Sequence, residues 1–94
     1  MLKKLDPLLH SELRLAIMSI LISVEKSEFT YIKEKTEATA GNLSVQLSKL
    51  EEAGYLKIEK AFKGKMPQTT CMITKKGIKA FEKYVEDLKD YLNL

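Results

Sequence analysis

Apolar residues recur at helical spacing in the first third of the chain. The positions that lie three or four residues apart are Leu13, Ile17, Ile20, Leu21 and Val24. This spacing places them on one face of an α-helix. Asp6 followed by Pro7 is typical of a helix start, and Ser11 offers a second start. The pattern predicts a first long helix that buries this stripe and ends near residues 25–27.

Two further helices are predicted before residue 55. Thr30 is expected to cap a short helix over residues 31–36, in which Ile32 faces the core. Thr39 is expected to cap the next helix, and Gly54 is expected to end it, because glycine is favoured just after a helix C-terminus. The apolar face of this helix consists of Leu43, Leu47 and Leu50. Two helices joined by a tight connection are typical of a helix-turn-helix.

After the third helix the spacing of apolar residues changes from helical to alternating. Leu56 and Ile58 lie on one side of a first predicted strand, and Cys71 and Ile73 lie on one side of a second. The intervening segment FKGKMP contains a glycine and a proline, which favour turns. The sequence therefore predicts a β-hairpin.

A last helix is predicted after Thr74, which can cap it. Its apolar positions are spaced by three, four, three and four residues, as in the seam of a coiled coil. Ile78 and Phe81 can pack on the first helix of the same chain. The rest of the seam extends beyond what a three-helix core can cover, and an exposed apolar face of that size marks an interface. The residues expected in a homodimer interface are Leu5, Leu9, Ile78, Phe81, Tyr84, Val85, Leu88, Tyr91 and Leu92.

The predicted order of elements is helix, helix, helix, strand, strand, helix. This order is that of an α+β, mainly helical winged helix-turn-helix, with three helices, a two-stranded β-hairpin wing and a long C-terminal helix. A length of 94 residues leaves no room for a separate sensor or catalytic domain. We expect one domain over residues 1–94, in which residues 75–94 form a dimerisation helix.

Charge and composition narrow the function classes. Sixteen Lys and Arg against thirteen Asp and Glu give a net charge of +3, which is too small to identify a nucleic-acid partner by itself. Residues 57–65 are locally basic, with four lysines and a single acid, Glu59. One cysteine and one histidine provide neither an internal disulfide nor the usual spacing of a zinc site. No constellation of nucleophile, base and metal occurs, so we expect no cofactor, no metal and no catalysis.

The N-terminal sequence MLKKLDPLLHSELRLAIMSIL has a charged start followed by apolar residues. Polar and charged residues interrupt the apolar part between positions 6 and 14, and no small-residue cleavage site follows. The longest uncharged run, residues 15–24, is too short to cross a bilayer. We therefore expect a cytoplasmic protein without a membrane segment.

The side of the third helix opposite its leucines carries small and polar residues that suit a DNA groove. Asn can bond adenine in bidentate fashion, Ser can bond base edges or phosphate, and Val can contact a thymine methyl group. Gly41 permits a close approach of the backbone, and the positive end of the helix dipole favours a phosphate there. Lysines near the hairpin tip would lie along the adjacent DNA backbone or minor groove. The residues expected to bind double-stranded DNA are Thr39, Gly41, Asn42, Ser44, Val45, Gln46, Ser48, Lys49, Lys60, Lys63 and Lys65.

The stretch TAGNLSVQLSKLEEAGYLKIEKAFKGKMPQTTCMITKKGIKAF resembles the small stand-alone winged-helix regulators related to the MarR and ArsR families. The recurring pattern is T-x-G-N-L-S, K-L-E-E-A-G-Y, K-x-F, P-x-T and L-T-x-x-G. In this chain its elements are Thr39, Gly41, Asn42, Leu43 and Ser44; residues 49–55; Lys60 and Phe62; Pro67 and Thr69; and Ile73, Thr74 and Gly77. The segment HSELRLAIMSIL is similar to the family's first long helix. This resemblance implies a dimeric bacterial or archaeal transcription regulator.

The chain also departs from these families. Val45 and Gln46 stand where many relatives carry His or Arg, so the base preferences of those relatives do not carry over. The cysteine pairs of metal-sensing members do not occur, so we expect no metal sensing. Cys71 is expected to be a buried core residue and His10 a residue of the helix cap region. Arg14 is expected to form an internal ion pair with a helix carboxylate.

The residues by themselves leave two functions open. A winged helix can bind DNA or dock onto a protein, and the fold does not decide between them. A polar helix face can simply be solvated, and lysines at a hairpin tip can simply keep a sheet edge soluble. Together with the resemblance, they predict a sequence-specific transcription regulator, expected to be a repressor, that binds an inverted-repeat operator as a homodimer. The alternative is a winged-helix protein-interaction module. The sequence identifies no effector.

Overall fold

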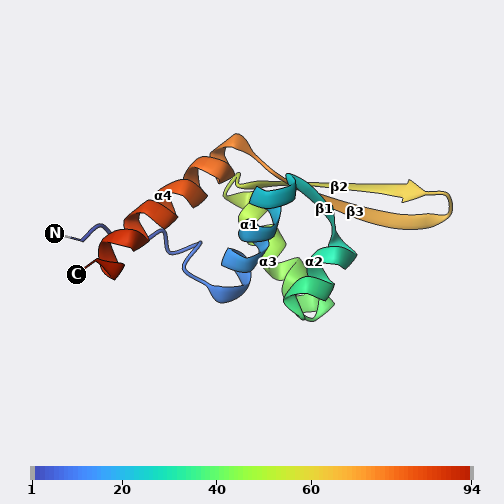
Figure 1. Cartoon of the computed structure of the whole chain (residues 1–94). Helices are drawn as coiled ribbons and strands as arrows, with labels where there is room; N and C mark the ends of the chain where they lie inside the picture. Colours follow the sequence, from blue (N-terminus) through green and yellow to red (C-terminus); the bar gives the residue numbers. More distant parts are fainter. Residues whose placement is uncertain (1, 94) are drawn as a thin grey trace.

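The computed structural model of the chain describes residues 2–93. Its elements in chain order are α1 (Glu12–Val24), β1 (Lys26–Glu28), α2 (Phe29–Thr36), α3 (Ala40–Glu52), β2 (Leu56–Lys63), β3 (Met66–Ile73) and α4 (Lys75–Leu92). The first three helices form the body of the molecule, and the hairpin of β2 and β3 extends from it on the side opposite to α4 (Figure 1). The molecule is correspondingly elongated, with dimensions of 54 × 25 × 21 Å. The predicted winged helix-turn-helix fold is confirmed.

Helix α1 begins at the second of the two predicted starts. The Ser11 hydroxyl oxygen accepts from the backbone N–H of Arg14 at 3.5 Å. Asp6 closes a turn before the helix instead, because its carboxylate accepts from the backbone N–H of Leu8 at 2.9 Å. The prediction of a start at Asp6 and Pro7 is therefore wrong.

The buried stripe of α1 differs in part from the predicted one. Ile17 and Leu21 are fully buried, as expected, but Met18 is buried with them and Val24 is 48% exposed. The last residue of the helix is Val24, one residue before the expected range. The next residue, Glu25, has a φ of 68°. Since this positive φ breaks the helical path, the chain leaves α1 directly into β1.

The two helices of the helix-turn-helix differ in how they begin. Helix α2 starts at Phe29, after the extended residue Glu28, and no side-chain hydrogen bond caps it. The prediction of Thr30 as its cap is therefore wrong. Helix α3 begins as predicted, because the Thr39 hydroxyl accepts from the backbone N–H of Asn42 at 3.1 Å. Gly54, with a φ of 82°, follows its C-terminal end.

The sheet contains a third strand that the sequence did not reveal. Strand β1 pairs antiparallel with β3, and β2 pairs antiparallel with the other edge of β3, in the order β1-β3-β2. Cys71 on the middle strand lies opposite Ser27 on one side and Ile58 on the other. The turn of the hairpin is shorter than expected, since Pro67 lies within β3 opposite Phe62. The wing is thus fixed at its base by β1.

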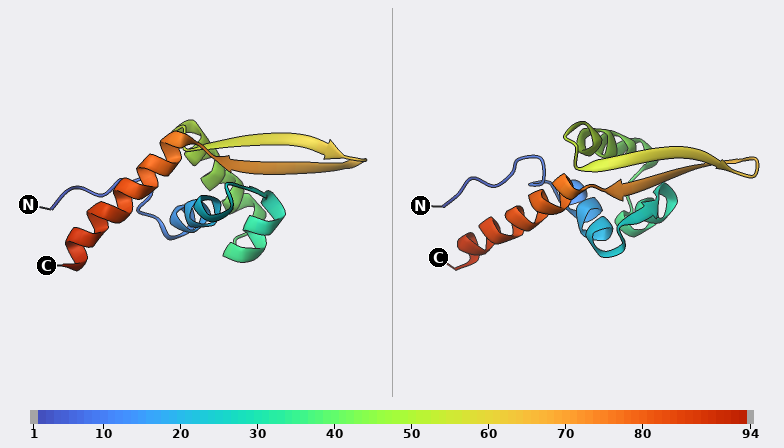
Figure 2. Two further views of the ribbon diagram at one scale, coloured as in Figure 1. Left: turned by 45° about the horizontal axis from the view of Figure 1, so that its top comes forward. Right: turned by 90° about the horizontal axis from the view of Figure 1, so that it is seen from above.

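The hydrophobic core lies between the three helices and the inner half of the sheet. The left view of Figure 2 shows α1 and α3 below the base of the hairpin, and in both views the outer part of the hairpin has no other element beside it. The buried core residues are Leu9, Ile17, Met18, Leu21, Ile32, Leu43, Leu47, Leu50, Leu56, Cys71 and Tyr84. The expected burial of Cys71 is confirmed.

Helix α4 is joined to α3 through Thr74. The Thr74 hydroxyl accepts from the backbone N–H of Gly77 at 3.0 Å and donates to the carbonyl oxygen of Gly54 at 2.6 Å. Gly77 is buried against Tyr55, whose carbonyl oxygen lies 2.3 Å from where a Cβ on Gly77 would be. These contacts set the direction in which α4 leaves the body.

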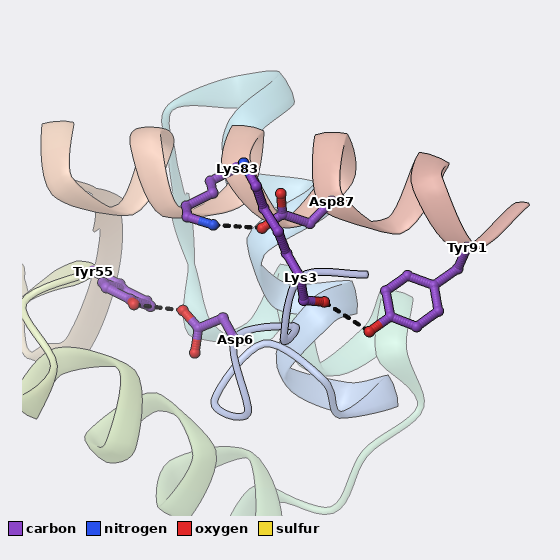
Figure 3. A network of polar contacts seen from close by, with 6 residues as sticks. All are labelled: Lys3, Asp6, Tyr55, Lys83, Asp87 and Tyr91. Atoms are coloured by element: carbon purple, nitrogen blue, oxygen red, sulfur yellow. Dashed lines mark hydrogen bonds and ion pairs between the residues drawn. The ribbon is translucent and has the colours of Figure 1, made fainter. Parts of the chain in front are cut away.

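The N-terminal segment, residues 2–11, runs alongside α4 and is held to the rest of the chain by tyrosines (Figure 3). The Tyr91 hydroxyl donates to the carbonyl oxygen of Lys3 at 2.7 Å, and the Tyr55 hydroxyl donates to the Asp6 carboxylate at 2.6 Å. Burial, followed by the neighbouring Asp6 carboxylate, raises the pKa of Tyr55 to about 12. His10, expected to be only a cap-region residue, makes a hydrogen bond of 3.0 Å from Nδ1 to the Tyr84 hydroxyl.

The residues expected in a homodimer interface divide into two groups. Leu9 and Tyr84 are buried in the chain's own core, which leaves them no surface for a second copy. The partly buried residues are Leu5, Ile78, Phe81, Val85, Leu88 and Tyr91. Leu92, by contrast, is 75% exposed at the end of α4. The apolar surface that a partner could cover therefore lies toward the C-terminal end of α4.

Candidate nucleic-acid interface

Helix α3 presents a solvent-facing side made of small and polar side chains. Its three leucines are buried, so the opposite side of the helix faces away from the core. The exposed residues on that side are Gly41, Asn42, Ser44, Val45, Ser48 and Lys49. Thr39 is also exposed, but its hydroxyl is used as the helix cap. Six of the eight residues predicted on α3 and its cap are therefore both exposed and outside the cap.

The space in front of Gly41 is open. A Cβ built on Gly41 would have no heavy atom within 4 Å, so the protein's own packing does not require a glycine there. Gly41 is the second residue of α3, where backbone N–H groups lack partners within the helix and favour an anion. This fits the expectation that a DNA backbone approaches the start of α3 closely.

A relay of hydrogen bonds runs from α1 to the exposed side of α3. Arg14 donates through Nη1 to Gln46 Oε1 at 2.5 Å and through Nε to the carbonyl oxygen of Leu8 at 2.6 Å. A guanidinium group has only donors, so the Gln46 oxygen must face Arg14. Gln46 Nε2 then donates to Asn42 Oδ1 at 3.0 Å. Asn42 is thereby held with its amide orientation fixed, and its Nδ2 group remains to donate to a base edge.

This relay changes the interpretation of two residues. Gln46 was expected to read bases, but it is half-buried and both ends of its amide are bonded within the protein. Arg14 was expected to pair with a carboxylate, but its partners are a carbonyl and an amide oxygen, and that expectation is wrong. The sequence carries no local signal for this pair, because Arg14 and Gln46 are 32 positions apart and meet only through the crossing of α1 and α3.

The wing lies beside α3 and is joined to it at its base. The Glu51 carboxylate on α3 accepts from the backbone N–H of Ile58 on the edge strand β2 at 3.2 Å. A groove between the two elements is lined by polar side chains of α3 and of the wing, among them Ser44, Ser48, Glu51, Lys60 and Thr69. Of the predicted residues, Ser44, Ser48 and Lys60 are thus brought together around one groove.

The outer part of the wing is positively charged. Residues 60–70 contain three lysines and no acidic residue. Lys60, Lys63 and Lys65 are exposed, and among the residues that the structure describes none of the three forms an ion pair. Glu59, the nearest acid along the strand, pairs with Lys57 at 3.3 Å. The unpaired lysines Lys63 and Lys65 lie at the tip of the hairpin, at the end of β2 and in the turn that follows.

Lys33 and Lys35 add positive charge that the sequence interpretation did not include. Both are exposed in the last turn of α2, directly before the connection to α3. The first helix of a helix-turn-helix crosses the DNA backbone, so lysines on it are suited to phosphate contacts. Their position just before the predicted turn was a signal available in the sequence.

Three further observations concern metal ligands, membrane-spanning helices and the single thiol. Within residues 2–93, no cluster of three or more His, Cys, Asp or Glu side chains is placed to hold a metal ion. None of the helices described there has the length and apolar character needed to cross a membrane. Burial, followed by the charge of Glu51, raises the pKa of the Cys71 thiol to about 11, so it stays protonated at neutral pH.

Comparison with known proteins agrees with this geometry. The family described as winged helix DNA-binding domain matches residues 13–92. An uncharacterized protein of Methanocaldococcus jannaschii is 40% identical over 80 residues, which are 84% of this chain and 86% of that protein. The structure of a transcriptional regulator homologue from Pyrococcus horikoshii has a TM-score of 0.86 at 29% identity, over 92% of this chain and 85% of that one.

A more distant similarity supports the fold alone. The structure of the transcriptional regulator BldR from Sulfolobus solfataricus has a TM-score of 0.73 at 23% identity. The match covers 88% of this chain but only 58% of that one. The winged helix is therefore shared with a longer protein.

Proposed function

The chain belongs to the winged helix DNA-binding domain family, and from this premise we propose that it is a sequence-specific, double-stranded DNA-binding transcription regulator. We further propose that it acts in the cytoplasm as a homodimer and that it represses, because occluding a promoter requires nothing beyond binding. The observation that carries the proposal is the groove between α3 and the wing. It places the exposed Ser44 and Ser48 of α3 beside Lys60 of the wing, which forms no ion pair among the described residues.

The roles of α3 and of the wing differ in this proposal. Helix α3 enters the major groove, where Asn42 and Ser44 contact base edges. Lys63 and Lys65 on the wing contact the phosphate backbone, which positions the protein without reading sequence. The relay through Gln46 orients Asn42 before DNA arrives.

Binding to duplex DNA at increasing salt concentration tests the first part of the proposal. Each phosphate neutralised by a lysine releases roughly 0.9 of a counterion, so the affinity for a random duplex should fall steeply as salt rises. Selection of bound duplexes from a random pool would then give the preferred site. Absent or salt-independent binding would favour a winged helix that docks onto a protein.

Substitutions on α3 and on the wing should separate the reading of bases from contacts to the phosphate backbone. Changing Lys63 and Lys65 to Ala should weaken binding to the preferred and random duplexes alike. Asn42→Ala should cost about 1 to 3 kcal/mol mainly on the preferred duplex. Fluorescence anisotropy with both duplexes measures this difference. Equal losses on both duplexes from all of these changes would show that α3 does not read bases.

A further inference from the structure

The wing carries a large apolar side chain that the core does not use. Phe62 is 76% exposed, and Met66 near the other side of the turn is 69% exposed. A phenylalanine kept in water forgoes a burial free energy that it would recover against an apolar surface. Neither residue contributes to the hydrophobic core of the described chain. Exposed apolar side chains at the tip of a basic hairpin are therefore suited to contact with an apolar surface of a binding partner.

The strand register places these two apolar residues on opposite faces of the hairpin. Pairing is regular from Leu56 to Lys63, so residues directly opposite each other share a face. Phe62 lies opposite Pro67, on the same face as Lys60, which lines the groove against α3. Met66 lies opposite Lys63, on the other face. Two residues of strand separate Lys60 from Phe62, roughly 7 Å, so Phe62 continues the groove face beyond α3.

The charge around Phe62 identifies nucleic acid as the partner that fits. Lys60 precedes Phe62 by two residues, and Lys63 and Lys65 follow it. Residues 60–70 contain no acidic residue. A phosphate backbone on each side of an apolar side chain is the environment offered by the minor groove of duplex DNA. The cross-strand partner Pro67 has a fixed φ, which limits the motion of the strand that supports Phe62.

We propose that Phe62 is an apolar wedge that enters the DNA minor groove next to the major groove occupied by α3, partly unstacks a base step and bends the duplex. The inference rests on the proposed function and adds a specificity determinant to it. Because the deformation is easiest at flexible pyrimidine–purine steps, the operator carries a TA or CA/TG step under the wing, at a position that α3 does not touch.

The test compares Phe62→Ala with Met66→Ala, a matched loss of an exposed apolar side chain from the opposite face of the same wing. Both should fold with unchanged melting temperatures, since neither residue is in the core. The DNA is a duplex selected by the wild-type protein and labelled at its two ends for energy transfer. A second duplex of the same sequence carries 2-aminopurine at the base step under the wing. The fluorescence of this base rises when it is unstacked.

The expected result is that the wild-type protein and Met66→Ala bend the duplex and raise the 2-aminopurine fluorescence, whereas Phe62→Ala does neither. The wild-type protein should also prefer a duplex made flexible by a two-base mismatch at that step, by roughly tenfold, because bending is then less costly. Phe62→Ala should lose this preference while its binding still weakens with salt.

Other outcomes would overturn the inference in distinguishable ways. Salt-dependent DNA binding by the wild-type protein without bending or unstacking would show that Phe62 is not a wedge. The proposed function would remain. Equal effects of Phe62→Ala and Met66→Ala would show that the face assignment is wrong. A lower sedimentation coefficient for Phe62→Ala without DNA, with bending unchanged, would assign Phe62 to a contact between copies of the chain. No binding of any duplex would overturn both proposals.

Discussion

At the scale of single residues, the exposed side of α3 depends on a side chain from another helix. Arg14 on α1 fixes the amide of Gln46, and Gln46 fixes that of Asn42. Arg14 itself is half-buried and bonds to no carboxylate among the described residues. In the proposed function it is therefore a positioning residue, which would act on DNA recognition through two other side chains.

Replacing Arg14 by Met or by Lys should have the same effect on DNA recognition. Lysine keeps the positive charge but cannot bond Leu8 and Gln46 together as the guanidinium fork does. Both variants should lower the preference for the selected duplex over a random one by about 1 to 3 kcal/mol, the value of one bidentate base contact. Anisotropy titrations with the two duplexes measure this preference. If Lys restored wild-type preference, a charge contact to phosphate would replace the relay.

Two weak acids, the buried Cys71 and the partly buried Tyr55, should make the stability of the fold sensitive to alkaline pH. Burial raises the pKa of Cys71 from 9.0 to about 11 and that of Tyr55 from 10.0 to about 12. The folded state thus holds these protons more strongly than the unfolded state. Their contribution to stability is fully present below the unfolded pKa values and is lost as pH rises from about 9 toward 12.

Urea unfolding between pH 7 and pH 11.5 should show this loss. In the wild-type protein the free energy of unfolding should start to fall near pH 9. In Cys71→Ala the fall should start about one pH unit later, where deprotonation of Tyr55 in the unfolded state begins. Tyr55→Phe provides the reverse control, since it keeps the early part of the fall. Identical pH profiles for the wild-type protein and Cys71→Ala would show that the thiol is not shifted.

At the scale of secondary-structure elements, the direction of α4 depends on the absence of a side chain at Gly77. A Cβ there would lie 2.3 Å from the Tyr55 carbonyl oxygen and 3.0 Å from Ile73 Cγ1. Gly77→Ala should lower the free energy of unfolding by about 1 to 3 kcal/mol, as overpacking usually does, although alanine is the better helix former. Gly41→Ala is the matched control, because its Cβ meets no atom and should leave stability unchanged or higher by up to about 1 kcal/mol. Urea denaturation of both variants compares the two sites.

The elements that the sequence could predict are those specified by nearby residues. Thr39 and Thr74 each bond a backbone N–H three residues ahead, so the starts of α3 and α4 follow from local chemistry. Strand β1 has no such signal, because its three residues are polar and its pairing with β3 depends on residues more than forty positions away. Thr30 was misassigned as a cap for the same reason, since β1 runs directly into α2.

The candidate site could be predicted to a similar extent. The exposed side of α3 follows from the spacing of its leucines, and the basic wing follows from four lysines within nine residues. The internal use of Gln46 could not be predicted, because it depends on how α1 crosses α3. The likeness to winged-helix regulators was predicted from the combined motifs and is confirmed by the family match over residues 13–92.

At the scale of the whole molecule, two elements protrude from opposite ends of the body. The wing extends from one end of the body, and α4 extends from the other end with the N-terminal segment beside it (Figure 1). A helix of 18 residues is roughly 27 Å long, so its outer turns lie well beyond the three-helix core. An interface at that end would leave α3 and the wing of each copy free for DNA.

A homodimer through the outer part of α4 is therefore the assembly that we propose, and Leu92 is the residue that tests it. Leu88 packs partly against the core, so a charge there would disturb the fold, whereas Leu92 is 75% exposed. Leu92→Glu would place a charge in an apolar interface at a cost of several kcal/mol and should give folded monomers. Asn93→Glu is the control, since it makes the same substitution one residue away at an exposed polar position.

Sedimentation at tens of micromolar should give dimers for the wild-type protein and for Asn93→Glu, and monomers for Leu92→Glu. A two-fold interface would direct the two α3 helices to successive major grooves, so the selected site should be an inverted repeat with half-sites about 10 to 10.5 bp apart. Leu92→Glu should then bind the full site only as weakly as a half-site, while its melting temperature stays near that of the control. A wild-type monomer with a folded α4, or equal behaviour of the two Glu variants, would show that the apolar side of α4 serves packing within one chain.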